Sequence, residues 1–350
     1  MSCNLLKKFG LAICGVGRAG TIHTKNCYRN PRVQIKYFVE IDTTKAEQLK
    51  NSLGLESTKV VSVDQIDKVL SDESVDGVII ASITSTHQEL IFKCIQAKKP
   101  VFCEKPIALQ LQDIAICYET AAKEKVPLFC AFNRRFDTSH ARVCKAAQLG
   151  EIGKIHMVRC ISRNSPLPSD DFLKQSGGIF HDCAVHDIDM ITWILGEYPI
   201  SVFTYAHAFR QSILEMGDVD TVSITMKFAS GCLAQIDISR FAAYGYDQRI
   251  EVFGELGMLE SVNQHKTSTI KSTKDHISRD LLLQSFPQRN AEGYVNELEH
   301  FLEIIEGATS TVTGKNVLMV SLIASACEKS YKSGKPITIH EQSITFKPSF

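Results

Sequence analysis

The sequence predicts an α/β fold of two domains, in which a Rossmann-type doubly wound parallel sheet precedes an α+β domain with a mainly antiparallel sheet. Three observations predict this class. Short apolar runs alternate with helical patterns up to about Phe132, and longer strand-like runs follow one another beyond about Gly153. The chain of 350 residues also exceeds the roughly 250 to 300 residues at which a single core stops growing. We therefore expect residues 1–133 to form the first domain and residues 134–350 the second, whose closing helices can pack back on the first.

The first domain is predicted to hold six short strands, each an apolar run of strand-forming residues. They are Phe9–Cys14, Val33–Val39, Lys59–Val63, Gly77–Ser82, Val101–Cys103 and Leu128–Phe132. Helical patterns lie between most of them, at Ala19–Cys27, Thr43–Leu53, Thr86–Ala97 and Leu109–Glu124. Thr43 is the predicted N-terminal cap of the second helix. This alternation is typical of βαβ units, which build a parallel sheet with helices on both faces.

The second domain shows consecutive strand patterns, which favour an antiparallel sheet. The predicted strands are Lys154–Ser162, Ile200–Phe209, Asp220–Phe228, Gly231–Arg240 and Gln248–Phe253. A tight hairpin is predicted between the third and the fourth strand, and closing helices are predicted at Tyr294–Glu306 and Asn316–Ser333. Two polar stretches, Ser165–Gln175 and Gln264–Arg279, are predicted to lie in surface loops.

The composition favours a small-molecule partner. The 39 basic and 39 acidic side chains cancel, so no overall charge attracts the protein to nucleic acid or to an anionic membrane. The longest apolar stretches, such as Val75–Ile83, fall well short of the roughly 20 residues that a bilayer span requires. The first residues carry no cleavage-site pattern of a signal peptide, and we expect a cytoplasmic protein.

The 12 cysteines are scattered from Cys3 to Cys327 without a CxxC pair, and most of them lie inside apolar runs. This pattern predicts buried free thiols and not a disulfide scaffold. Redox or zinc-binding roles are the less favoured alternatives.

A glycine-rich turn follows the first strand and matches the dinucleotide-binding pattern GxGxxG. Its residues are Gly15, Val16, Gly17, Arg18, Ala19 and Gly20. Gly15 permits the sharp turn, Gly17 lets the backbone approach a pyrophosphate, and Gly20 allows the helix to pack closely on the strand. Glu40 ends the second strand, where a carboxylate can accept hydrogen bonds from a ribose and repel a 2′-phosphate. This pairing favours NAD over NADP; the alternative is a plain tight turn and a solvated glutamate.

Glu104, Lys105 and Pro106 follow the fifth parallel strand, at the sheet edge where open α/β folds bind ligands. Pro106 restricts Lys105 to extended conformations and stiffens the turn. We therefore expect Lys105 to point toward the cofactor, with a solvated loop lysine as the plainer alternative.

The segment from Gly177 to Asp189 predicts an amphipathic helix with an unusual polar face. At 100° per residue, Asp182, His186, Asp189 and Trp193 share one side of this helix. A solvated helix face usually carries lysine, glutamate or arginine, so we expect this one to line a cleft. A plain surface helix is the alternative.

His186 can act as a general base for an alcohol, because its ordinary pKa of about 6.5 lets it accept a proton at neutral pH. Asp182, one turn away, can orient the imidazole or stabilise its charged form. A metal site built from His181, Asp182, His186 and Asp189 is less favoured, because no thiolate or further histidine stands at ligand spacing. We therefore predict no metal.

Together these motifs resemble the glucose-fructose oxidoreductase and inositol dehydrogenase (Gfo/Idh/MocA) family over nearly the whole chain. The segments that carry the resemblance come in the family's order: Thr84–His87, Cys103–Pro106, Phe132–Asp137, Gly177–Asp189 and Tyr244–Arg249. The last segment is the most telling for inositol-type members. The resemblance implies an NAD-dependent oxidoreductase that oxidises a ring hydroxyl of a cyclic polyol, with myo-inositol and its 2-keto product as the leading choice and nicotinamide as the hydride acceptor.

The resemblance also implies a set of site residues. Lys105, Asp182 and His186 would form a catalytic trio, in which Lys105 holds the substrate hydroxyl and His186 takes its proton. The implied cofactor contacts are Gly15, Val16, Gly17, Arg18, Ala19, Gly20, Glu40, Ser82, Thr84, His87 and Glu104. The implied substrate contacts are the trio together with Arg134, Asn164, Asp189, Tyr244 and Tyr246. A homo-dimer or homo-tetramer, formed through an exposed face of the C-terminal sheet, is implied as well.

Three positions depart from the family pattern. Asn164 stands where an aspartate is common, His181 replaces an apolar residue, and Asn290 stands where a tyrosine often occurs. Because these changes can reshape the polyol pocket, the same chemistry on another inositol isomer, an aldose or a dihydrodiol is the first alternative. A non-catalytic dinucleotide-binding regulatory protein is the second, although loss of the lysine or the histidine would be its expected signature.

Overall fold

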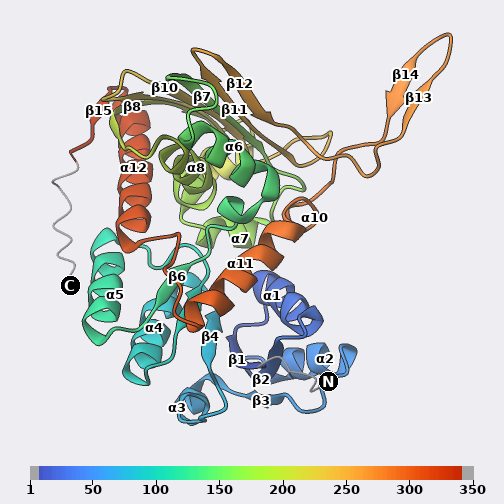
Figure 1. The fold of residues 1–350 in the computed structure, drawn as a ribbon, viewed down its shortest axis with the longest axis vertical. Coiled ribbons are helices and arrows are strands. Elements are labelled where there is room, and N and C mark those ends of the chain that lie inside the picture. Colours follow the sequence, from blue (N-terminus) through green and yellow to red (C-terminus); the bar gives the residue numbers. More distant parts are fainter. Residues whose placement is uncertain (1–7, 341–350) are drawn as a thin grey trace. The chain divides into compact units, whose positions relative to one another are not determined.

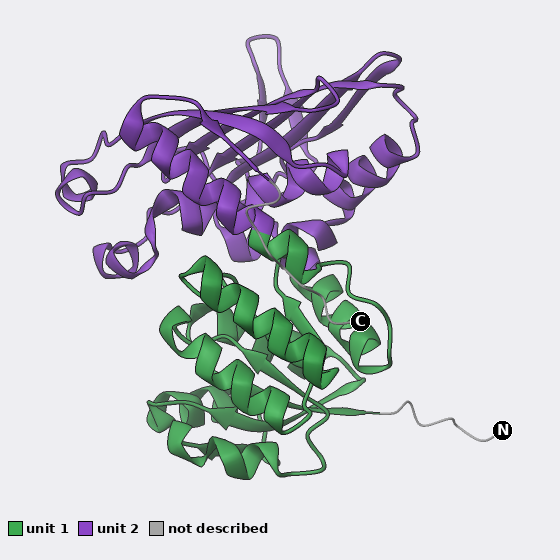
Figure 2. Cartoon of the chain, turned by 90° about the vertical axis from the view of Figure 1, so that its left-hand side faces the viewer, with its two compact units in different colours: residues 1–133, 294–318, 345–350 green, residues 134–293, 319–344 purple. Residues whose placement is uncertain are grey.

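A computed structural model describes residues 8–340, which form two units (Figure 2). Unit 1 contains residues 8–133 and 294–318, and unit 2 contains residues 134–293 and 319–340. The first break in the chain, after Asn133, falls at the boundary that the sequence analysis chose, whereas residues 294–318 return to unit 1. Between residues 8 and 340, no helix is both long enough and apolar enough to cross a membrane.

Unit 1 is built on a six-stranded parallel sheet in the order β3-β2-β1-β4-β5-β6, which is the Rossmann strand order and confirms the predicted fold class. Its strands are β1 (Phe9–Cys14), β2 (Val33–Val39), β3 (Lys59–Val61), β4 (Gly77–Ile80), β5 (Val101–Cys103) and β6 (Leu128–Cys130). Every residue of β1, β4, β5 and β6 is buried, as expected for a parallel sheet with helices on both faces. The strand order reverses between β1 and β4, which is where such sheets bind ligands at their carboxyl ends.

The helices of unit 1 follow the predicted order, with one addition. They are α1 (Arg18–Arg29), α2 (Thr43–Ser52), α3 (Ile66–Leu70), α4 (His87–Gln96) and α5 (Leu111–Glu124). The short helix α3 was not predicted. Asp42, and not Thr43, caps α2, because its carboxylate accepts a hydrogen bond from the backbone N–H of Lys45 at 3.2 Å.

The helix α11 (Ala291–Ile305) completes the core of unit 1 although it comes late in the chain (Figure 1). Gly77 of β4 leaves room for it, since a Cβ there would stand 2.9 Å from Ile305 and 3.1 Å from Phe301. The ring of Phe301 meets the ring of Phe102 in β5 edge to face, at 5.6 Å between centroids. Because α11 packs on the central strands, the first unit is discontinuous in sequence.

Unit 2 is built on a seven-stranded sheet in the order β12-β11-β7-β10-β9-β8-β15. Its strands are β7 (Ile155–Arg163), β8 (Pro199–His207), β9 (Thr221–Phe228), β10 (Leu233–Ser239), β11 (Asp247–Gly254), β12 (Gly257–Ser261) and β15 (Ile337–Thr338). All neighbours are antiparallel except β7 and β10, which pair in parallel. The sheet is therefore mainly antiparallel, as predicted.

The register of three central strands brings distant segments to one edge of this sheet. Arg163 at the end of β7 pairs with Ser239 at the end of β10 and with Asp247 at the start of β11. The next residues along the chain, Asn164 and Arg240, and the residue before β11, Tyr246, therefore lie at the same edge.

One face of the sheet is covered by α6 (Thr138–Gln148), α8 (Val185–Leu195) and the second part of α12 (Gly314–Ser333) (Figure 1). The other face leaves apolar side chains exposed. Tyr205 of β8, Leu233 of β10 and Phe253 of β11 alternate with less exposed neighbours along their strands, and Met258 of β12 pairs with Phe253. This surface is called the open sheet face below.

The remaining elements lie in the connections. The predicted loop Ser165–Gln175 contains a short helix, α7 (Asp170–Gln175), and the polar stretch Gln264–Arg279 forms an exposed hairpin of β13 (Ile270–Ser272) and β14 (Ile277–Arg279). Two further short helices are α9 (Gln211–Glu215) and α10 (Phe286–Arg289).

Candidate functional site

The glycine-rich turn lies between β1 and α1, with Gly17 as the N-cap of the helix. Gly15 has φ +89°, and a Cβ there would stand 2.6 Å from the backbone nitrogen of Ser82. At Gly20, a Cβ would stand 1.9 Å from the carbonyl oxygen of Gly15. A Cβ at Gly17, in contrast, would meet nothing within 4 Å. The turn thus has two glycines that its own packing requires and one that faces open space, which fits the approach of a pyrophosphate to the helix N-terminus.

Glu40 follows β2 and reaches this turn. One oxygen of its carboxylate accepts a hydrogen bond from the backbone N–H of Val16 at 2.7 Å, and the other accepts one from Ile41 at 2.9 Å. The predicted acidic partner is therefore brought to the glycine-rich turn, where its charge opposes a 2′-phosphate. The backbone N–H groups of this turn, together with the carboxylate of Glu40, fit NAD.

Ser82, Thr84 and His87 belong to the connection after β4. Thr84 opens a short 3₁₀ turn, and the hydroxyl of Ser82 lies 2.7 Å from that of Thr86. His87 is only 1% exposed, with Nδ1 2.9 Å from the Pro106 carbonyl oxygen and Nε2 3.1 Å from that of Ser82. Burial lowers the pKa of His87, and a neutral imidazole donates to only one of the two. His87 thus joins two loops, a placement that argues against the direct cofactor contact implied for it.

Glu104 and Lys105 follow β5 at the carboxyl edge of the sheet. The carboxylate of Glu104 lies 2.7 Å from Nε2 of His23, a buried residue of α1. Burial raises the pKa of Glu104, but the hydrogen bond from His23 and the charges of His23 and Lys105 outweigh it, so the net pKa is lowered. Glu104 is therefore a charged group beside Lys105 that is tied to α1. The peptide bond between Lys105 and Pro106 is cis.

Glu297 of α11 is fully buried in the same unit. Within residues 8–340, neither of its carboxylate oxygens has a hydrogen-bond partner. Burial, and then the charge of Glu104, raises its pKa well above the ordinary range. Burial and the charge of Glu104 therefore both favour the protonated form of Glu297.

Asp182 lies in a π-helical turn, Phe180–Ala184, that leads directly into α8, and His186 is the second residue of α8. Both side chains are half-buried. The predicted amphipathic helix is wrong in two respects. A π-helical turn departs from 100° per residue, and α8 is buried nearly all round, including Asp187 and Asp189. Such turns occur often at functional sites, because the extra residue redirects nearby side chains.

Two of the implied substrate contacts lie in buried ion pairs. Arg134 binds Asp187 at 2.5 Å and the Ser162 hydroxyl at 3.1 Å. Arg135 binds Asp189 through two hydrogen bonds of 2.8 and 2.6 Å. These pairs fasten the turn Asn133–Phe136 to α8, and they argue against a direct polyol contact of Arg134 or Asp189.

The other implied contacts gather at the sheet edge defined above. The amide nitrogen of Asn164 lies 3.4 Å from the sulfur of Cys183, next to Asp182. Tyr246 is mostly buried and is hydrogen-bonded to Arg134. Tyr244 is exposed, and its hydroxyl donates to Asp247 at 2.6 Å and accepts from Arg163 at 3.2 Å. Asn164 and Tyr246 thus lie near the π-helical turn, with Tyr244 at the surface.

Sequence reasoning missed Arg240 and Asp218. Arg240 is fully buried and lies 3.1 Å from Asp182 and 2.9 Å from Asp218. Its partner Asp182 is 58 residues away in the chain, and no spacing rule connects them.

Two of the positions that depart from the family pattern, His181 and Asn290, have surroundings other than the sheet edge that gathers Asn164 and Tyr246. His181 faces Glu328 of α12 at 3.3 Å, and Asn290 is buried at the end of α10. In residues 8–340, no three His, Cys, Asp or Glu side chains are grouped as a metal site.

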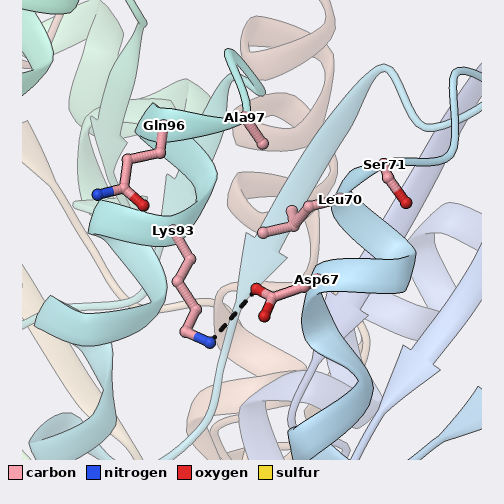
Figure 3. Close-up of a pocket in the computed structure, with 6 residues that line it drawn as sticks. All are labelled: Asp67, Leu70, Ser71, Lys93, Gln96 and Ala97. Atoms are coloured by element: carbon pink, nitrogen blue, oxygen red, sulfur yellow. Dashed lines mark hydrogen bonds and ion pairs between the residues drawn. The ribbon is translucent and has the colours of Figure 1, made fainter.

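A groove on unit 1 lies between α3 and α4 (Figure 3). Lys93 and Asp67 form an ion pair across it at 3.3 Å. None of the six residues that line the groove is a predicted site residue.

Two family models match the chain. Residues 9–132 match the oxidoreductase family with an NAD-binding Rossmann fold, and residues 140–260 match the GFO/IDH/MocA C-terminal domain. The two matches correspond to the two sheets described above.

Characterised relatives match nearly end to end. A myo-inositol 2-dehydrogenase of Thermotoga maritima is 35% identical over 95% of this chain and 98% of its own. An inositol 2-dehydrogenase of Rhizobium meliloti is 37% identical over 95% and 99%. Among solved structures, scyllo-inositol dehydrogenase from Lactobacillus casei, with NAD(H) and scyllo-inositol bound, is 25% identical with a TM-score of 0.87 over 95% of this chain and 99% of that one.

Proposed function

Because this chain belongs to the GFO/IDH/MocA oxidoreductase family, we propose that it oxidises a ring hydroxyl of a cyclic polyol, with myo-inositol and its 2-keto product as the leading assignment. The chain is an NAD-dependent dehydrogenase that acts on a CH–OH group. The observation that carries the substrate proposal is the near end-to-end similarity to two inositol 2-dehydrogenases.

The residues of unit 1 would hold the cofactor. Backbone N–H groups of the turn Gly15–Gly20 suit the pyrophosphate, and Glu40 suits the ribose hydroxyls. When bound, NAD supplies the acceptor for the hydride that leaves the substrate carbon. Ser82 and Thr84 are proposed to contact the cofactor from the next strand connection, while His87 and Glu104 shape the loops that carry them.

The catalytic roles are proposed residue by residue. Lys105 holds the substrate hydroxyl and favours its deprotonation through its positive charge. His186 takes the hydroxyl proton as general base while the C–H bond gives up its hydride, so that the alcohol becomes a ketone. Asp182 orients the imidazole and stabilises its charged form. Asn164, Tyr244 and Tyr246 are proposed to contact the polyol.

The test is a turnover panel with NAD and NADP side by side. We expect myo-inositol to reduce NAD, and NADP to be used much less well because of Glu40. No reduction of either cofactor by myo-inositol would remove the leading assignment. NAD binding without turnover of any polyol, aldose or dihydrodiol would favour the non-catalytic regulatory protein.

The second candidate substrate is scyllo-inositol. The structural similarity to an enzyme with scyllo-inositol bound favours it. The two isomers differ only in the orientation of one hydroxyl, so the same panel decides between them by the ratio of their kcat/KM values.

We also propose that the protein is a homo-dimer or homo-tetramer that buries the open sheet face against a second copy. Tyr205, Leu233, Phe253 and Met258 supply the apolar contacts there, and exposed apolar groups gathered on one face favour an interface. A cytoplasmic location is proposed from the eleven cysteines of the described chain, which are all buried thiols outside disulfides.

A further inference from the structure

Arg240 is the largest fully buried side chain in residues 8–340. One nitrogen of its guanidinium lies 3.1 Å from the carboxylate of Asp182, and another lies 2.9 Å from that of Asp218. A buried arginine is costly unless its charge is paired, and two carboxylates pair this one. The guanidinium thus links Asp182 of the implied catalytic trio to Asp218, a second aspartate that sequence reasoning did not find.

The fold explains how the three residues meet. Arg240 directly follows β10, and its backbone N–H donates to the carbonyl of Asp220 at 2.8 Å. The carboxylate of Asp218 also accepts a hydrogen bond, at 3.2 Å, from the backbone N–H of Ile179 at the start of the π-helical turn. Asp218 therefore holds both the arginine and the turn that carries Asp182.

Arg240 is the positive member of a cluster whose other titratable groups are acidic. Its titratable groups are Asp182 and Cys183 of the π-helical turn, Asp218 before β9, and Arg240 after β10. Burial lowers the pKa of Arg240, but Cys183, Asp182 and Asp218 outweigh it and the net pKa is raised. The guanidinium therefore stays charged, and both carboxylates lie within 3.1 Å of it.

We propose that Arg240 is a positioning residue for the reaction, which holds the carboxylate of Asp182 in one orientation beside a positive charge, with Asp218 as its anchor. This inference rests on the proposed function, in which Asp182 supports the general base His186. Arg240 acts through Asp182.

The experiment compares Arg240→Gln and Arg240→Lys with the wild type, using the polyol that the wild type oxidises best. In Arg240→Gln we expect kcat to fall by up to about 100-fold, because Asp182 is no longer held in place. The acid limb of the kcat profile should move to higher pH by about one unit or more, because a nearby positive charge is lost. The Kd for NAD should not change, since the cofactor residues belong to unit 1.

Arg240→Lys separates charge from geometry. Its ammonium keeps the positive charge, so the acid limb should stay near that of the wild type. It lacks the planar fork that reaches two carboxylates at once, so kcat should remain low. Such partial rescue is not expected of a residue that only fills space.

A matched control is Arg289→Gln. Arg289 is also a buried arginine of unit 2, paired with Asp137. Its loss should lower the unfolding temperature while kcat and the acid limb stay as in the wild type.

If Arg240→Gln fails to fold, Asp218→Asn carries the test. That variant keeps both Arg240 and Asp182, so we expect a lower kcat and an acid limb at lower pH, because a negative charge is lost. Wild-type kcat and acid limb in the variants that fold would overturn the inference. A wild type that oxidises no polyol would overturn the proposed function instead, and the positioning role would fall with it.

Discussion

His186 is half-buried at the start of α8, two residues beyond the π-helical turn that carries Asp182. We expect His186→Ala to lower kcat by about 10² to 10⁴-fold, because the hydroxyl proton loses its acceptor. The affinity for NAD should stay nearly unchanged. Steady-state kinetics and a fluorescence titration with NADH measure the two effects. His276→Ala, in the exposed hairpin, is the control, and a fully active His186→Ala enzyme would contradict the role of the base.

Glu297 makes stability depend on pH. Its folded pKa is raised, so unfolding releases a proton at any pH between its ordinary pKa and the raised one. Stability therefore falls as pH rises through this window. We expect the wild type to lose up to about 1.4 kcal/mol of unfolding free energy per pH unit relative to Glu297→Gln.

Denaturant unfolding at several pH values between about 5 and 8 measures this slope. Glu299→Gln is the matched control on the same helix, because Glu299 is partly exposed and pairs with Arg32. A difference between wild type and Glu297→Gln that does not vary with pH would contradict the raised pKa of Glu297.

At the scale of elements, the glycine-rich turn separates packing from binding. Gly17 has no neighbour within 4 Å of a Cβ, so Gly17→Ala should fold normally. The added methyl group would obstruct one or two hydrogen bonds to a phosphate, worth about 1.5 to 3 kcal/mol each, and weaken NAD binding by roughly tenfold or more.

Calorimetric titration with NAD, together with the unfolding temperature, tests Gly17→Ala. Gly257→Ala is the control, because its Cβ meets only an ordinary contact, 3.8 Å from Ile152, in unit 2. Unchanged NAD affinity in Gly17→Ala would place the cofactor elsewhere.

The β1–turn–α1 element could be predicted because its requirements are local. The apolar strand, the three glycines and the acid after β2 each follow from adjacent sequence, and the structure has them close to the predicted bounds. The π-helical turn could not be predicted, since hydrophobic periodicity at 100° per residue contains no signal for one extra residue. The predicted polar face failed for a second reason, because Asp189 is buried against Arg135, which precedes it by 54 residues.

In unit 1, the parallel sheet with helices on both faces followed from the alternation of strands and helices. The parallel pairing of β7 with β10 did not, because pairing between strands about seventy residues apart leaves no trace in either strand. The cluster of Arg240, Asp182 and Asp218 depends on that pairing and was missed with it.

The open sheet face leads to a prediction about assembly. We expect the wild type to have a mass of two or four times 38.9 kDa, and Tyr205→Asp to shift it toward the monomer, because a buried unpaired charge is costly. Light scattering coupled to gel filtration measures the mass. Tyr28→Asp, at an exposed tyrosine of α1, should leave it unchanged, and a monomeric wild type would contradict the proposed interface.

The late return of α11 to the first sheet has a consequence for biosynthesis. Phe102 and Gly77 pack against Phe301 and Ile305. These two partners are synthesised about two hundred residues later than the strands that they cover. The nascent Rossmann half therefore emerges with an uncovered apolar surface and cannot finish folding until almost the whole chain has been translated. In a stalled-ribosome experiment, a nascent chain that ends at residue 133 should be sensitive to protease. A chain that is released after residue 318 should contain a protease-resistant first domain.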